Sequence, residues 1–308
     1  MEKSEKGFIP VMLTPFNSDG TIDYTSLGTL TNRYLNAGVK GLFTNCLSSE
    51  MFELNDEEQI QLTRRVVELA DGSVPVVTTG TFGGPIAKQA EFVKRIYDTG
   101  VHAVILITSM ITGEHDPDSV FDEKVFELLH LTPSIPVGFY ECPVPFKRLL
   151  SAPQLASFVD TGRVIYHKDT SLDLDQIKAK INATSHHPEF NLYDAYMGHA
   201  VSSLQAGAAG LSCIQGNYFP ELIVWLCQNY DDQSLTEEVT AIQDFLIAHM
   251  DVMHNVYPTG AKYSLQQQGL NISTFTRREV GDFSSDRKKE IEQLGLDYTV
   301  LQQRIGII

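Results

Sequence analysis

The chain has 308 residues, of which 43% are hydrophobic and 20% charged, a composition typical of a globular protein with a large apolar core. Its 39 acidic residues against 23 Lys and Arg give a formal net charge of −16, so we expect neither nucleic acid nor an anionic membrane surface as a partner. The same charge gives an anionic substrate no long-range attraction, and local groups must capture it.

The four cysteines form no CxxC pair, and the opening segment MEKSEKGFIPVM lacks an apolar stretch of signal-peptide length. We therefore expect a reduced, cytoplasmic protein without a secretion signal. The longest apolar runs, such as 104–107, are too short to span a bilayer.

From the N-terminus, helical patterns alternate with short apolar runs. Asp23 precedes a helical pattern that stops at Gly38, and Asn55 precedes a second one, with Glu58 at capping-box spacing. A short phrase then recurs as AGVKGLF, TGVHAVI and AGAAGLS, in which a glycine separates a helical pattern from an apolar run. This order predicts a helix ended by a left-handed glycine and followed by a buried strand, the unit of a parallel sheet covered by helices.

Eight runs are candidate strands: 8–13, 41–45, 75–79, 102–108, 136–140, 163–168, 190–193 and 209–214. Eight βα units predict a closed (β/α)8 TIM barrel of the α/β class, because closure removes the sheet edges. An open doubly wound sheet is the structural alternative, but no GxGxxG motif opens a helix after the first strand.

After residue 215 the pattern becomes helical only, with FPELIVWLCQ, an amphipathic stretch around 234–254, YPTGAKYSLQQQGL and DRKKEIEQLG. We predict a barrel over residues 1–230 and a C-terminal helical extension over 231–308, packed on the barrel or on a neighbouring subunit.

Lys168 ends the sixth predicted strand, on the face that alternation turns into the barrel. Burial lowers the pKa of a lysine, and a neutral amine is the form that attacks a ketone to make a Schiff base. The alternative is a strand-end lysine that reaches solvent or pairs with Asp169. His167 alternates away from Lys168 and should face the surrounding helices.

Tyr140 ends the fifth predicted strand, so it should share the barrel mouth with Lys168, where a phenol can donate and take back a proton. A tyrosine at a barrel rim is the alternative.

Ser48 and Ser49 follow the second strand, where hydroxyls and successive N–H groups of a turn suit a carboxylate. An ordinary capped turn is the alternative.

The close histidine pairs are His186 with His187, in a polar loop, and His249 with His254, on the late helices. Both are expected to lie away from the barrel mouth, and no metal site is expected.

Several segments together carry a family resemblance: GFIPVMLTPFNSDGTIDYTSL, CLSSE at 46–50, FYECP at 139–143, YHKDTS at 166–171, AGAAGLSCIQGN and YPTGAKYSLQQQGL. With them the chain resembles, over nearly its whole length, a divergent member of the dihydrodipicolinate synthase / N-acetylneuraminate lyase family. The resemblance implies a barrel with three C-terminal helices, usually in a tetramer built from dimers, and a Schiff base to pyruvate or a related 2-oxo acid.

By position, the resemblance gives Lys168 the Schiff-base role and Tyr140 the proton-shuttle role. Ser48 and the Ser49 backbone would hold the carboxylate. Leu47 and Ile214, at the ends of the second and eighth strands, complete the expected substrate-binding set. The resemblance implies neither a metal nor another cofactor, because the iminium serves as the electron sink.

The sequence also departs from the family pattern. Leu47 replaces a hydroxyl residue, and Ser109, Met110 and Ile111 stand where the synthases have a tyrosine pair. Pro145 falls where the synthases have an arginine, although Lys147 and Arg148 are close, and Met197 and Gly198 fall where the sialic-acid lyases have an acidic pair. These departures argue against lysine biosynthesis and sialic acid. Leu47, Met110, Ile111 and Pro145 predict a less polar pocket that fits a smaller or more apolar aldehyde.

The expected function is therefore a class I lyase or aldolase that joins a 2-oxo acid to an aldehyde or cleaves the product, in a homo-oligomer of two or four chains. One alternative is a dehydratase of 2-oxo-3-deoxy sugar acids that uses the same lysine. The other is a barrel that binds a 2-oxo acid without catalysis.

Overall fold

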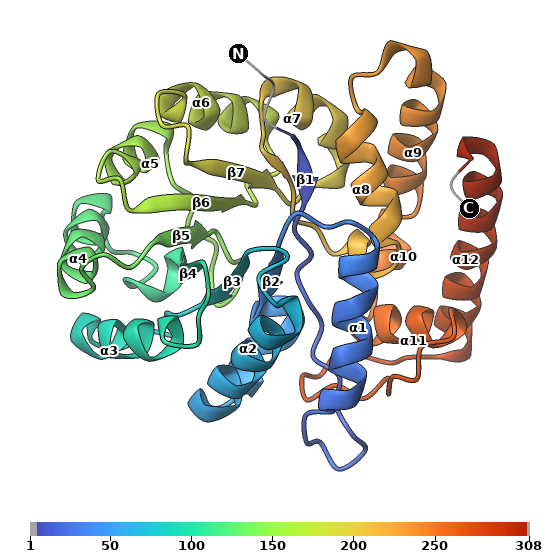
Figure 1. Ribbon diagram of the computed structural model, residues 1–308, viewed down its shortest axis with the longest axis horizontal. Coiled ribbons are helices and arrows are strands. Elements are labelled where there is room, and N and C mark those ends of the chain that lie inside the picture. The colour runs from blue at the N-terminus through green and yellow to red at the C-terminus, as the bar shows by residue number, and fades with distance from the viewer. Residues whose placement is uncertain (1–4, 307–308) are drawn as a thin grey trace.

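The structure, a computed structural model, describes residues 5–306 and centres on an eight-stranded parallel sheet in the order β1-β8-β7-β6-β5-β4-β3-β2 (Figure 1). The strands are β1 (Gly7–Phe8), β2 (Leu42–Thr44), β3 (Val76–Thr79), β4 (Ala103–Ile107), β5 (Val137–Tyr140), β6 (Val164–Asp169), β7 (Asn191–Asp194) and β8 (Gly210–Leu211). The sheet closes where Val11 bridges Phe43 and the Met12 N–H donates to the Phe43 carbonyl at 2.9 Å. The predicted TIM barrel is confirmed.

Most strands are shorter than the sequence predicts, and β1 and β8 differ most. The run 8–13 forms a ladder only at Gly7–Phe8 before the bridge at Val11, because Pro10 between them has no N–H to donate. The run 209–214 pairs only at Gly210–Leu211. A side chain at Gly210 would collide with the Gly7 carbonyl, so a glycine is needed where β8 meets β1.

Eight helices cover the barrel, one after each strand (Figure 1). They are α1 (Tyr24–Asn36), α2 (Asp56–Ala70), α3 (Ile86–Tyr97), α4 (Asp118–Leu131), α5 (Ala152–Val159), α6 (Leu174–Thr184), α7 (Ala200–Ala206) and α8 (Pro220–Asn229). Asp23 caps α1, and Asn55 with Glu58 forms the capping box of α2, as their spacing predicts.

Four further helices lie on one side of the barrel, next to α1 and α8: α9 (Thr236–Ala248), α10 (Met250–His254), α11 (Thr259–Gln267) and α12 (Ser285–Ile305) (Figure 1). The amphipathic stretch 234–254 is thus two helices, because the backbone leaves helical geometry at His249. One apolar cluster contains barrel side chains such as Leu27 together with Leu246 and Leu301 of the extension. Where a domain boundary falls stays a prediction.

A buried ion pair joins the extension to the barrel. The Lys262 ammonium on α11 lies 2.9 Å from the carboxylate of Glu50, and both side chains are fully buried. The same carboxylate accepts the N–H groups of Arg277 and Arg278 at 2.7 and 2.9 Å. The extension therefore fixes the turn after β2.

None of the described helices combines the length and the apolarity that a bilayer crossing requires.

Candidate active site

Neighbouring strands place a lysine and a tyrosine side by side inside the barrel mouth. Tyr140 on β5 pairs in register with Lys168 on β6. The Lys168 ammonium nitrogen lies 4.3 Å from the centroid of the Tyr140 ring, and each residue is 4% exposed. Strand alternation turns both side chains to the interior, where few water molecules can reach them.

The surroundings of Lys168 favour its neutral form. Burial lowers the pKa of its amine, and the nearby ionisable groups are the thiols of Cys46, Cys142 and Cys213. Within residues 5–306, no carboxylate forms an ion pair with Lys168, and Asp169 instead pairs with Lys180. Lys168 is therefore a desolvated amine without a counter-ion, as a Schiff-base lysine requires.

Tyr140 is a protonated phenol at neutral pH. Burial raises the pKa of Tyr140 well above its ordinary value, and the thiols of Cys142 and Cys46 raise it further. Its hydroxyl interacts with the Cys142 thiol, and the rings of Tyr140 and Phe43 pack edge to face at 5.8 Å between centroids. These contacts place a protonated phenol beside the Lys168 amine.

The two residues open into a cavity of about 300 Å³. Its walls are Leu47, Ser48, Tyr140, Pro143, Lys147, Lys168, Thr170, Leu172, Ala195, Tyr196, Met197, Ser212, Cys213, Ile214, Gln215, His254, Tyr257 and Arg278. The structure thereby brings together Leu47, Ser48, Tyr140, Lys168 and Ile214 of the predicted set. A volume of this size suits a small metabolite.

Ser48 and Ser49, in the turn after β2, have different surroundings. The Ser49 hydroxyl donates to the Met12 carbonyl at 2.6 Å, and the Ser49 N–H donates to the Cys46 carbonyl at 2.9 Å. Both polar groups of Ser49 are engaged in holding the turn, and Ser49 does not line the cavity. Ser48 does line it, and its hydroxyl interacts with that of Tyr257. A carboxylate-binding role for Ser49 stays a prediction that this geometry does not favour.

The extension contributes His254, Tyr257 and Arg278 to the cavity wall. The expectation that His254 lies away from the barrel mouth was wrong, because His254, the last residue of α10, lies in the cavity wall. The Tyr257 hydroxyl also accepts from the Asn217 amide at 2.5 Å, which links the extension to the turn after β8. The order of strands and helices does not mark these three residues, since none of them follows a strand, although Tyr257 opens the segment YPTGAKYSLQQQGL that carries part of the resemblance.

The cavity is also more basic than the sequence predicts. Met110 and Ile111 line a separate depression near Gly83, where the Met110 carbonyl accepts from Gln89 on α3 at 3.0 Å. Pro145 is not part of the cavity wall either, so Leu47 is the one residue of the four named for an apolar pocket that lines the cavity. Lys147 and Arg278 line the cavity instead, and among the described residues that line it there is no Asp or Glu.

Lys147 and its neighbour Arg148 point to different places. The Lys147 ammonium donates to the Thr170 carbonyl at 2.8 Å and stays at the cavity wall. The Arg148 guanidinium turns away, pairs with Asp118 at 2.9 Å and stacks over the Phe121 ring at 4.9 Å. Only Lys147 is therefore placed to meet a ligand.

Behind the two catalytic candidates lies a buried network of Glu141, His167, Asp169 and Lys180. The Lys180 ammonium on α6 lies 2.6 Å from Glu141 and 2.7 Å from Asp169, and His167 lies 3.5 and 3.7 Å from the same carboxylates. His167 thus faces the helices, as its alternation with Lys168 predicts. Glu141, His167 and Asp169 are close enough to hold a metal ion, but the Lys180 ammonium occupies the cation position.

The network sets the ionisation of its members. Burial alone would raise the pKa of Asp169, but the neighbouring His167 and Lys180 hold it well below its usual range. Burial likewise opposes the charge on Lys180, yet Glu141 and Asp169 raise its pKa above the ordinary value. Because Glu141 follows Tyr140, and because His167 and Asp169 flank Lys168, these contacts fix the two strand ends that carry the candidate site.

Comparison with known proteins identifies the family of the chain. The chain matches the model of the dihydrodipicolinate synthetase family over residues 4–295. It is 22% identical over 296 residues to the probable 2-dehydro-3-deoxy-D-pentonate aldolase YjhH of Escherichia coli K12, covering 95% of this chain and 97% of that protein. It is 25% identical over 268 residues to the 4-hydroxy-tetrahydrodipicolinate synthase of Oceanobacillus iheyensis, covering 86% and 88% of the two chains.

Among solved structures, a similar one is that of YagE from Escherichia coli K12 in complex with pyruvate, a prophage protein of the dihydrodipicolinic acid synthase family. The TM-score is 0.84 at 20% identity, with 98% of this chain and 99% of that chain covered. At this identity the likeness shows a shared fold.

Proposed function

The chain belongs to the dihydrodipicolinate synthetase family, and from this membership we propose that it is a class I aldolase acting on pyruvate or a related 2-oxo acid. One observation carries the proposal. The buried, unpaired amine of Lys168 lies against the Tyr140 ring at the wall of the cavity. The names of the relatives support the same chemistry, since they include aldolases of 2-dehydro-3-deoxy sugar acids and synthases.

In the proposed mechanism, the neutral Lys168 amine attacks the C2 ketone and forms a carbinolamine. Tyr140 donates a proton to the departing hydroxyl, so that water leaves and an iminium remains, and the phenolate later takes a proton back. The iminium withdraws electrons from C3, which loses a proton and becomes an enamine carbon. That carbon attacks the aldehyde, and hydrolysis of the new iminium releases the aldol and the free amine. Cleavage is the same sequence in reverse.

Ser48 is the proposed carboxylate ligand of the 2-oxo acid. It lines the cavity beside Leu47, and the interaction of its hydroxyl with Tyr257 fixes its orientation. A carboxylate held there would bring the adjacent ketone toward Lys168, and positioning of this kind supplies a large part of the barrier reduction in bimolecular reactions.

We propose that the aldehyde partner carries an anionic group. Lys147 and Arg278 line the cavity, whereas no acidic side chain among the described residues does so, in a chain whose formal net charge is −16. Two cations at the wall of a cavity within an acidic protein favour a ligand with negative charge beyond the first carboxylate. This proposal replaces the earlier expectation of a small, apolar aldehyde.

Borohydride reduction in the presence of pyruvate tests the central proposal. We expect a covalent pyruvate adduct that peptide mapping locates at Lys168 and that is absent in Lys168→Met. Lys147→Met is the matched control, because it removes a cavity lysine that has no part in imine formation, and it should keep the adduct. An adduct on another lysine, or none with any 2-oxo acid, would contradict the proposal and favour a non-catalytic binding barrel.

A dehydratase of 2-oxo-3-deoxy sugar acids stays the second candidate, because it would use the same lysine on the class of substrate that the names of two relatives print, although those relatives are named as aldolases. Product analysis separates the two reactions. The aldolase releases pyruvate and an aldehyde, whereas the dehydratase releases water and retains every carbon. We further propose that the enzyme works in the cytoplasm and that it forms a dimer or a tetramer. Sedimentation analysis tests the number of chains in the assembly.

A further inference from the structure

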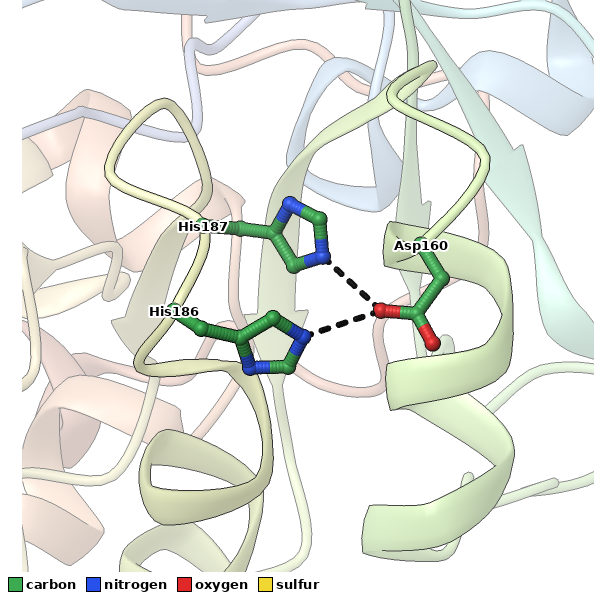
Figure 2. A group of neighbouring side chains, drawn as sticks. All are labelled: Asp160, His186 and His187. Carbon is green, nitrogen blue, oxygen red and sulfur yellow. Dashed lines mark hydrogen bonds and ion pairs between the residues drawn. The ribbon is translucent and has the colours of Figure 1, made fainter.

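Three side chains converge on the barrel end opposite the cavity. Asp160 follows α5 just before β6 begins, and His186 and His187 follow α6 just before β7. Lys168 lies at the other end of β6, so this cluster is separate from the candidate active site. Figure 2 shows both imidazole rings pointing at one oxygen of the Asp160 carboxylate.

The convergence is close. The Nε2 atoms of His187 and His186 lie 2.8 and 3.0 Å from the same Asp160 Oδ1, and the two ring centroids are 4.2 Å apart. The histidine hydrogen bonds, that of His187 first, lower the pKa of Asp160, so its carboxylate is ionised at neutral pH. Side-chain exposures of 29% for His187, 59% for His186 and 56% for Asp160 leave the cluster open to solvent.

The backbone holds these side chains in place. The Asp160 N–H donates to the Ala156 carbonyl at 2.8 Å, at the end of α5. The His187 N–H donates to Thr184 at 3.0 Å, and its carbonyl accepts from Phe190 at 3.1 Å. Both attachment points are therefore ordered, and bringing three ligands together at this place costs little further entropy.

We propose that Asp160, His186 and His187 form a binding site for one divalent transition-metal ion of the kind imidazole prefers, with Zn²⁺ as the representative. Two imidazole nitrogens and one carboxylate oxygen are donors that zinc commonly takes, and water completes the coordination. In a tetrahedral site with bonds of about 2.0–2.2 Å, neighbouring ligand atoms lie about 3.3 Å apart. The two N–O distances of 2.8 and 3.0 Å therefore need to open by only a few tenths of an ångström.

A comparison with the buried group of Glu141, His167 and Asp169 supports the choice of site. Those three residues also offer ligand atoms close together, but the Lys180 ammonium already lies between the carboxylates. At the Asp160 cluster, no lysine or arginine of the described residues forms an ion pair with the carboxylate. The position that Lys180 fills in the buried group is therefore available to a metal ion here.

A bound ion would join the segment before β6 to the segment before β7. Because it would bind the folded chain, where the three ligands meet, it would stabilise that state by mass action. The ion would lie at the far end of β6 from Lys168, so the inference does not depend on the proposed aldol chemistry.

The test is calorimetric titration of Zn²⁺ into untagged, chelator-treated protein near pH 7.5. We expect one equivalent to bind the wild type. His186→Gln and His187→Gln should each weaken binding at least about tenfold, which is the least that loss of even an outer-shell partner costs. The double variant should lose stoichiometric binding. His115→Gln, which changes an exposed histidine before α4, is the matched control and should bind Zn²⁺ as the wild type does.

Two further measurements make the test decisive. Mg²⁺ should not bind, because it prefers oxygen ligands, and Zn²⁺ should raise the melting temperature of the wild type but not of the double variant. The pyruvate adduct at Lys168 should form equally in all these proteins, which verifies their folding and separates this inference from the proposed function. Absence of stoichiometric Zn²⁺ binding by the wild type, or undiminished binding by the double variant, overturns the proposal.

Discussion

Two buried lysines lie on opposite sides of the same pair of strands and show how position determines the chemistry of an amine. Lys168 points into the barrel, has no carboxylate partner among the described residues, and has a pKa lowered by burial. Lys180 reaches the outer side of β5 and β6 from α6, lies between Glu141 and Asp169, and has a raised pKa. The first amine is suited to react, and the second is suited to hold the strands together.

The contrast follows from strand alternation. Adjacent residues of β6 face opposite sides, so Lys168 meets thiols and aromatic rings whereas His167 and Asp169 meet the charged network. A buried charge without a partner is costly, so burial in that position favours the neutral form of the amine. A buried charge with two carboxylates is compensated, and its removal leaves those carboxylates uncompensated.

Replacement of the interior amine should remove activity and leave stability intact. Lys168→Met should lower kcat/KM for aldol cleavage at least about a thousandfold, because no imine can form. Its free energy of unfolding should equal or exceed that of the wild type, since a methionine of similar shape needs no partner in an apolar barrel. Steady-state kinetics and urea unfolding measure the two quantities. A strongly destabilised variant would show that Lys168 has a structural role.

Replacement of the outer amine should give the opposite result. Lys180→Met should lower the free energy of unfolding by about 3–5 kcal/mol, because Glu141 and Asp169 lose their buried counter-ion. Urea unfolding measures the change, and whatever protein stays folded should still trap pyruvate on Lys168. The matched control is Lys178→Met, a half-exposed lysine on the same helix, which should unfold as the wild type does. Equal stability of the Lys180 and Lys178 variants would contradict the compensated network.

Removal of the phenol should slow proton transfer without preventing imine formation. Tyr140→Phe keeps the ring against the Lys168 amine but removes the hydroxyl, and kcat should fall about 10²–10⁴-fold. The borohydride adduct should still form at Lys168, although more slowly. Rapid-quench kinetics measures both steps. An unchanged kcat would show that another group carries the proton.

The two lysines should also differ in how stability depends on pH. Lys168 has a lowered folded pKa, so the unfolded chain binds more protons, and its contribution to stability rises with pH between the lowered value and about 10.4, the unfolded value. Lys180 has a raised folded pKa, so its contribution is fully present below about 10.4 and is lost only above that value. The free energy of unfolding of the wild type should therefore rise relative to that of Lys168→Met as pH increases on the alkaline side of neutrality. Urea unfolding over that range measures it, and a constant difference would refute the lowered pKa.

The smallest expected effect concerns Lys147, an exposed lysine at the cavity wall, in contrast to the buried Lys168 and Lys180. Lys147→Met should raise KM for an anionic aldehyde about tenfold and leave KM for a neutral aldehyde of equal length unchanged, because it removes one charge contact and no reacting group. Competition between the two aldehydes measures the preference. An equal effect on both would mean that Lys147 contributes to folding of the loop and not to recognition.

Much of the fold could be predicted because its signals are local. The caps at Asp23 and Asn55, the glycine that recurs after three of the helical patterns and the spacing of apolar runs all act within a few residues. The break of the stretch 234–254 at His249 could not be predicted in this way. No glycine or proline marks the break at His249. The residues that follow it include His254 and Tyr257, which line the cavity.

In the candidate site, too, some features follow from the local sequence and others from the tertiary structure. The sequence by itself determined that Lys168 and Tyr140 end neighbouring parallel strands and that His167 faces the helices, because alternation and βα order are properties of consecutive residues. Only the tertiary structure decided that Tyr257, His254 and Arg278 line the cavity, that Met110 and Ile111 do not, and that Lys180 neutralises Glu141 and Asp169. These contacts join residues far apart in the chain, and their geometry depends on how whole helices pack, which local patterns do not encode.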